Sequence, residues 1–314
     1  PNGLAQEATK ANMKNLEAYD YVKFDLLSLD TLNPIKKIYG KDVDWDDISC
    51  EEAWEILNKG ETDYVFQLQE AIPKKMLTSV KITSINQLAE ISTINRPGPL
   101  ALGLHEKWVD IQNGIEEFEG EDLVLRNLLK GAFGEEHTGL VIYQEDVMKI
   151  FEVGASFTLG EADDIRRAMG NKDSSYMLAY KDQFIKNWKL EGNPELIWDK
   201  LEGFCKYAFN KSHAVAYALI SYQAAKIWAL HRSTYMEWLI NNTSGKKRNL
   251  ALETCKDLGW DLCYPHYTNI ISSPEYRIED GKVIIPVDFS GSFRSLSNFV
   301  FSDLSKIAKS NLSL

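Results

Sequence analysis

The sequence has 314 residues, of which 44% are hydrophobic and 26% charged, a balance typical of a globular protein with room for two or three domains. Its apolar runs are too short to cross a bilayer, and no basic, apolar signal segment is recognisable. The net charge of −11 argues against binding nucleic acid through bulk charge, although basic residues cluster around Arg166 and Lys211.

The cysteines give no indication of a metal site. Cys50, Cys205, Cys255 and Cys263 are scattered, and no two form a C-x-x-C pair. Reduced thiols of this kind are typical of a cytoplasmic protein, which is the localisation we expect.

The first part of the chain mixes short elements with acidic loops. Residues 21–29 begin like a strand, and residues 51–58 predict a short helix that stops at Gly60. The acidic stretch 42–47 starts like a calcium loop, but its sixth position is Asp47 rather than glycine and its twelfth is Ala53 rather than glutamate. We interpret it as a solvated loop.

Helical patterns dominate from residue 84 onward. Ser84 with Gln87, and Thr158 with Glu161, have the spacing of a capping box. The first of these helices should end before the Arg96-Pro97 pair, and the second should close at Gly170.

The remaining helices lead to an extended segment near the end. Asn193-Pro194 predicts the start of another helix, and the apolar run 212–241 predicts one long buried helix. Residues 260–264 and 276–286 look extended, and Asp280-Gly281 between alternating runs predicts a hairpin.

Six blocks, in order, resemble the α subunit of bacterial DNA polymerase III, the C-family replicative polymerases. The likeness runs from about residue 19 to about residue 286. The blocks are K-F-D-L-L-S-L at 23–29, V-F-Q-L-Q at 65–69, R-P-G-P-L at 96–100, V-I-Y-Q-E-D-V-M at 141–148, L-G-E-A-D with R-R-A-M-G at 159–170, and F-N-K-S-H followed by S-Y-Q at 209–223.

The resemblance implies part of a two-metal nucleotidyl transfer site. It makes Asp25 the third aspartate of the palm and a ligand of Mg²⁺, which prefers carboxylate oxygens. Lys23 would share the face of Asp25 and lie against the triphosphate of the incoming dNTP. The alternative is a lone aspartate that closes a strand.

The resemblance assigns Arg166 and Arg167 to the phosphates of the nucleotide, since the guanidinium fork binds phosphate oxygens in pairs. In the alternative, the two arginines form a solvated pair with Asp163 and Asp164.

The turn Asn210, Lys211, Ser212 and His213 would also face the nucleotide, because a helix N-terminus is a ready anion site. His213 could protonate the leaving pyrophosphate, while a capping Ser212 and a packed His213 would explain the turn without catalysis.

The family's primer-template DNA would lie near Arg96, Tyr143 and Gln144. The prolines and glycine that follow Arg96 predict a stiff turn, so a purely structural hinge is the alternative for this segment.

The resulting fold class is α+β and predominantly helical. We expect residues 1–32 to be the C-terminal edge of a palm, 33–245 to be helical fingers, and 246–314 to be a small α/β end with a divergent tail.

The palm blocks with the other two aspartates, and the PHP and clamp-binding regions of the family, have no counterpart here. The leading hypothesis is therefore a split polymerase piece that is inactive alone and completed by an upstream chain, with a C-terminal chain that binds the clamp as a further partner. The alternatives are a non-catalytic DNA- or nucleotide-binding remnant and a truncated gene product.

Overall fold

A computed structural model describes residues 16, 19–22, 29–40, 43–115, 117–171, 174–263 and 275–286. The helices in this part of the chain are α2 Leu32–Tyr39, α3 Glu51–Lys59, α4 Ala71–Ser79, α5 Ile85–Ile94, α6 Pro97–Ala101, α7 Leu104–Gln112, α8 Gly120–Phe133, α9 Gln144–Ala155, α10 Leu159–Asn171, α11 Ser174–Asn187, α12 Pro194–Cys205, α13 Lys211–Leu230, α14 Arg232–Asn242 and α15 Lys246–Asp257. The strands are β1 Asp261–Cys263, β2 Arg277–Glu279 and β3 Lys282–Ile284. The fold is thus α+β and mostly helical, as the sequence predicts.

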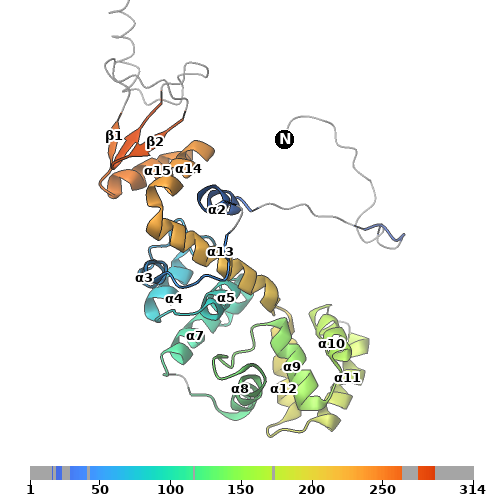
Figure 1. The fold of residues 1–314 in the computed structure, drawn as a ribbon. Coiled ribbons are helices and arrows are strands. Elements are labelled where there is room, and N and C mark those ends of the chain that lie inside the picture. Colours follow the sequence, from blue (N-terminus) through green and yellow to red (C-terminus); the bar gives the residue numbers. More distant parts are fainter. Residues whose placement is uncertain are drawn as a thin grey trace, which may run out of the picture.

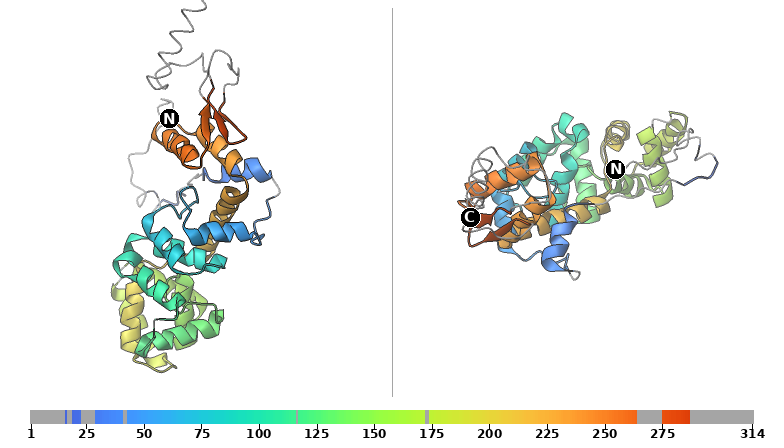
Figure 2. Two further views of the ribbon diagram at one scale, coloured as in Figure 1. Left: turned by 90° about the vertical axis from the view of Figure 1, so that its left-hand side faces the viewer. Right: turned by 90° about the horizontal axis from the view of Figure 1, so that it is seen from above.

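The helices gather into two groups along an elongated body (Figures 1 and 2). The central helix α13 packs against α2, α3 and α5, while α4 packs against α3 and α5 and α7 packs against α5, with α14, α15 and the small sheet beyond the C-terminal end of α13. The helices α8 to α12 form the second group beside the start of α13. None of the helices in the described residues has the length and apolarity needed to cross a membrane.

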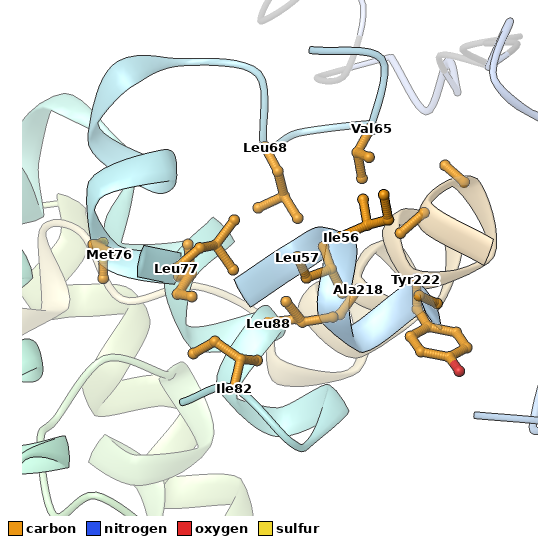
Figure 3. Close-up of a cluster of buried hydrophobic side chains, with 14 of the residues drawn as sticks. Ile56, Leu57, Val65, Leu68, Met76, Leu77, Ile82, Leu88, Ala218 and Tyr222 are labelled. Carbon is orange, nitrogen blue, oxygen red and sulfur yellow. The ribbon is translucent and has the colours of Figure 1, made fainter. Parts of the chain in front are cut away.

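Each group has its own apolar core. The α13 cluster takes Leu57, Leu88 and Tyr222, which come from α3, α5 and α13 and pack together in Figure 3. The α9 cluster is built on Phe151 and Trp198 of the second group. Between them, the extended residues 140–142 alternate: Leu140 and Ile142 enter the α13 cluster, and Val141 enters the α9 cluster, as side chains on an extended chain must.

Local signals fix most helix ends where the sequence predicts them. Ser84 and Gln87 form both hydrogen bonds of a capping box at α5, and Thr158 and Glu161 do the same before α10. Gly60 ends α3 in the left-handed conformation, which glycine adopts without a Cβ penalty. The α10 helix runs one residue past Gly170.

Asn193 caps α12 through two backbone N–H groups, with Pro194 as the first helical residue, as predicted. The prediction of one helix over 212–241 is wrong, because α13 ends at Leu230 and α14 begins at Arg232. His231 lies between them with φ −132° and ψ 35°, outside the helical region. The Arg232 side chain donates to the Trp228 carbonyl (Nε–O 3.2 Å) and so replaces part of the interrupted backbone pattern.

The predicted hairpin is confirmed. Asp280 and Gly281 both have positive φ, at 47° and 70°, in the tight turn between β2 and β3. The strand order is β1-β3-β2, with β1 parallel and β2 antiparallel to β3. Val283 and Cys255 connect this sheet and α15 to the α13 cluster.

The acidic loop is more ordered than the solvated loop that we expected. Gln223 donates to the carbonyl of Asp47 (3.3 Å), and the Lys226 ammonium lies 2.5 Å from the Asp47 carboxylate. The hydrogen bond from the Lys226 ammonium to the Asp47 carboxylate holds the pKa of Asp47 well below its usual range. The loop is therefore exposed but fixed to α13.

Candidate functional site

The starts of α9 and α13 lie side by side and are joined through their backbones (Figure 1). The Gln144 N–H donates to the Phe209 carbonyl (2.9 Å), and the Phe209 N–H donates to the Ile142 carbonyl (3.1 Å). The Gln144 side chain adds a longer bond to the Ala208 carbonyl (3.4 Å). Two predicted blocks, 141–148 and 209–213, therefore meet in one place.

The turn at residues 210–213 opens α13. Asn210 is its N-cap and accepts the His213 N–H (2.8 Å), so Ser212 is not the cap that the sequence offered as an alternative. Ser212 and His213 are both exposed. The His213 ring packs on Tyr217, with the ring centroids 4.1 Å apart, and on Phe209.

Glu145 binds this turn from the first turn of α9. Its Oε1 accepts from the Asn210 side-chain amide (3.0 Å), and its Oε2 accepts from the Lys211 N–H (2.9 Å). A carboxylate at a helix N-terminus is stabilised by the helix dipole and the free amides. The first turn of α13 thus already holds an anionic group from this chain.

The Lys211 ammonium lies over two aromatic rings. Its Nζ is 4.8 Å from the ring centre of Phe133 and 5.5 Å from that of Tyr143. Tyr143 is only 2% exposed, so its ring contacts Lys211 from within the core. A small cavity of about 50 Å³ adjoins these residues and is lined by Asn86, Glu90, Phe133, Glu136, His137, Tyr143 and Lys211.

A buried polar network lies behind the Phe133 and Tyr143 rings that contact Lys211. Asp146 is completely buried and accepts the N–H groups of Ile142 and Tyr143 (3.0 and 2.8 Å). Its other oxygen lies 3.2 Å from His137 Nε2. Because His137 Nδ1 accepts the Gly139 N–H (3.0 Å), the Nε2 atom carries the proton and donates to Asp146.

Glu90 is a second buried carboxyl close to His137. It accepts from Trp108 Nε1 (2.7 Å) and from the Thr138 hydroxyl (3.3 Å). Burial raises the pKa of Glu90 to about 7, although the Trp108 hydrogen bond opposes the rise. The carboxyl also lines a cleft of about 500 Å³ with Arg126 and Lys130.

Arg96 is engaged inside the protein. Its guanidinium donates to the carbonyls of Thr93 (2.9 Å) and Tyr207 (2.6 Å) and lies 4.4 Å from the ring centre of Phe209. A Cβ at Gly98 would lie 2.9 Å from the Tyr207 ring, so glycine permits this close approach. These contacts fit the structural alternative for this segment; contact of Arg96, Tyr143 or Gln144 with DNA stays a prediction.

Arg166 and Arg167 share one carboxylate on α10. Arg166 binds Asp163 Oδ1 through two nitrogens (3.0 and 2.8 Å), and Arg167 Nη2 lies 2.6 Å from Oδ2. Arg167 is 64% exposed, whereas Arg166 is 19% exposed. This is close to the solvated pair that we considered, with Asp163 as the shared partner; their binding to phosphate stays a prediction.

The helix α10, which carries Arg166 and Arg167, packs against α12, the helix that precedes α13. Burial raises the pKa of the Cys205 thiol to about 12, and the positive charge of Arg166 opposes that rise. The Cys205 sulfur also lies 3.4 Å from that of Met169. Arg166 is therefore close to a residue that precedes Asn210 by five positions.

Lys23 and Asp25 lie outside the described residues, so the predicted palm aspartate is not placed relative to these groups. Within the residues that are described, no three His, Cys, Asp or Glu side chains are grouped to hold a metal ion. A Mg²⁺ site at Asp25 stays a prediction.

Sequence reasoning missed Glu145, Asp146, Glu90 and Phe133. The only available signal was the pair of acidic residues Glu145 and Asp146 inside the 141–148 block, and acidic pairs of this kind are common at helix starts. Their partners lie far away in the sequence, so their roles become visible only in three dimensions.

The family model described as the bacterial DNA polymerase III alpha subunit finger domain matches residues 27–192, more than half of the chain. The chain belongs to this finger-domain family. Relatives named DNA polymerase III subunit alpha extend the similarity beyond the matched fingers. One from Aquifex aeolicus is 33% identical over 274 residues, covering 82% of this chain and 23% of the relative.

Two further relatives that are also named DNA polymerase III subunit alpha match most of this chain. The protein from Caulobacter vibrioides is 35% identical over 294 residues, which is 88% of this chain and 25% of the relative. A protein from Helicobacter pylori is 28% identical over 344 aligned positions, which is 97% of this chain and 28% of the relative. These fingers and their flanks therefore span about a quarter of the length of the relatives they match.

Proposed function

We infer that this chain supplies the nucleotide-binding fingers of a DNA-directed DNA polymerase, together with its third palm aspartate. The complete reaction would add a dNTP to a primer 3'-hydroxyl on template DNA. Asp25 would hold Mg²⁺ with two aspartates of an upstream chain, which would also carry the PHP domain and the rest of the palm. We propose a cytoplasmic location for the assembly.

The observation that carries this proposal is the meeting of two family blocks at the start of α13. The Asn210–His213 turn and the Lys211 ammonium bring hydrogen-bonding and cationic groups to this place, and Arg166 and Arg167 lie on α10, which packs against the helix α12 that precedes the turn. Lysine, arginine and a helix N-terminus are the groups that bind phosphate.

Nucleotide binding tests the fingers directly. Titration of the chain with Mg–dATP, followed by calorimetry, should give saturable binding. Replacing Arg166 and Arg167 together by alanine should weaken it at least about tenfold, since two charge-assisted contacts are lost. Arg277→Ala is the matched control, because Arg277 is an exposed arginine on β2. Equal affinity in the double variant and the control would contradict the phosphate assignment.

Primer extension tests the catalytic part. Extension should appear only when the chain is mixed with the polypeptide that carries the upstream aspartate pair, recovered by pull-down. Asp25→Asn should abolish extension while leaving Mg–dATP binding by the fingers in place. Primer extension that survives Asp25→Asn would show that Asp25 is not a catalytic residue. Binding without extension in any mixture would favour the non-catalytic alternative.

A further inference from the structure

Glu145 makes an unusual contact between two distant helix starts. As the second residue of α9, it reaches across to the turn that opens α13, 65 residues away. One carboxylate oxygen accepts from the Asn210 side-chain amide (3.0 Å) and the other accepts from the Lys211 N–H (2.9 Å). Both oxygens are therefore used as acceptors by the same short turn.

The orientation of Asn210 makes this contact specific for a carboxylate. Asn210 Oδ1 accepts the His213 N–H (2.8 Å), so the Asn210 amide cannot rotate without losing the helix cap. Its NH₂ group must then face residue 145. A glutamine at 145 could accept from Lys211 or from Asn210, but its own NH₂ group would meet a donor at the other position.

The same end of α9 also holds the Lys211 side chain. The Tyr143 ring lies under the Lys211 ammonium, and the Tyr143 N–H is bound by the buried Asp146 carboxylate (2.8 Å). Glu145 thus fixes the backbone of Lys211, while Tyr143 fixes its charged end. Both constraints come from the start of α9, where Tyr143 is the N-cap, and Phe133 of α8 adds a second ring beside the ammonium.

We propose that Glu145 is a positioning residue of the nucleotide site, which holds the Asn210–His213 turn in the geometry that binds the triphosphate. This role rests on the proposed function. In the competing arrangement, Glu145 occupies the place of a phosphate and must be displaced by it. The two arrangements predict opposite changes in nucleotide affinity when the charge of Glu145 is removed.

The first experiment compares the wild-type chain with Glu145→Gln. Glu145→Gln should weaken Mg–dATP binding about tenfold, because a hydrogen bond to a charged acceptor is lost and the turn loosens. Hydrogen exchange of the amides of residues 211–214 should also become faster. The exchange measurement needs no nucleotide, so it reports on the turn alone.

A swapped pair provides the rescue. In the double variant Glu145→Gln with Asn210→Asp, an aspartate at 210 caps His213 and accepts from the glutamine, which still accepts the Lys211 N–H. The net charge is unchanged, and all three hydrogen bonds are restored. Amide exchange at residues 211–214 should return to the wild-type rate, which a simple loss of packing or charge would not produce.

Glu152→Gln is the matched control, because Glu152 also lies on α9 but pairs with Lys149. It should leave both measurements unchanged. Tighter Mg–dATP binding in Glu145→Gln, or unchanged amide exchange, would overturn the positioning role. Failure of the wild-type chain to bind Mg–dATP would instead count against the proposed function, since the exchange rates would still report on Glu145.

Discussion

Glu90 shows how burial sets the chemistry of one residue. The residue is 5% exposed, and its carboxyl has two donors, Trp108 and Thr138, with the His137–Asp146 pair nearby. A carboxylate in such a place loses more hydration than two hydrogen bonds return. The pKa of Glu90 accordingly rises from 4.5 to about 7.

This shift predicts a pH-dependent stability. The folded state binds the Glu90 proton more tightly than the unfolded state, so the stabilising contribution is complete below about pH 4.5 and is lost as the pH rises through about 7. Between pH 4.5 and 8, the free energy of unfolding of the wild type should fall relative to Glu90→Gln by on the order of 3 kcal/mol. Urea unfolding of both chains at several pH values measures the difference.

Glu117→Gln serves as the comparison, because Glu117 is exposed. The free energy of unfolding of Glu117→Gln should show the same pH dependence as that of the wild type across this range. Parallel pH profiles of the wild type and Glu90→Gln would show that Glu90 keeps an ordinary pKa in the folded protein.

Among the elements, α13 has two roles, one at its first turn and one near its middle. Its first turn forms part of the proposed nucleotide site. Further along, Ser221 donates to the Phe66 carbonyl (2.8 Å), and the Tyr222 hydroxyl accepts the Cys50 N–H (2.9 Å) and donates to the Cys50 carbonyl (3.1 Å). The S-Y-Q part of the last block is thereby explained as an anchor for loops.

Removing one anchor should destabilise the fold without affecting the site. Tyr222→Phe leaves the N–H and C=O of Cys50 without their partner, which should lower the free energy of unfolding by about 1–3 kcal/mol. Tyr217→Phe is the control, because the Tyr217 hydroxyl makes no hydrogen bond within the described residues. Denaturant unfolding gives both values; equal stabilities would mean that water replaces the lost hydroxyl at Cys50.

Helix ends were predictable where the signal is local. The capping boxes at Ser84 and Thr158 and the Asn193-Pro194 start need only residues within one turn. The break at His231 was not, because neither glycine nor proline marks it. There the His231 ring packs edge-on against Tyr39 of α2, with centroids 5.5 Å apart, a contact that no local pattern reveals.

For the whole molecule, the sequence predicted the class of fold, but neither the contact between the 141–148 and 209–213 blocks nor the division of the helices into two groups. The two apolar clusters cut across the expected finger segment 33–245, and Val283 of the C-terminal sheet joins the α13 cluster. The proposed nucleotide site likewise combines residues with a local signal and residues without one. Asn210 and Lys211 were recognisable from their motif, whereas Glu145 depends on a partner from another helix.

The chain passes between the two clusters between Phe118 and Val124, at residues 140–142 and near Phe209, and the backbone bridge joins the last two of these crossings. Lys211 extends from a helix of one cluster onto Phe133, at the end of a helix of the other. The electrostatic surroundings of this cation are therefore set jointly by Tyr143 of the α13 cluster and by Phe133 at the end of α8.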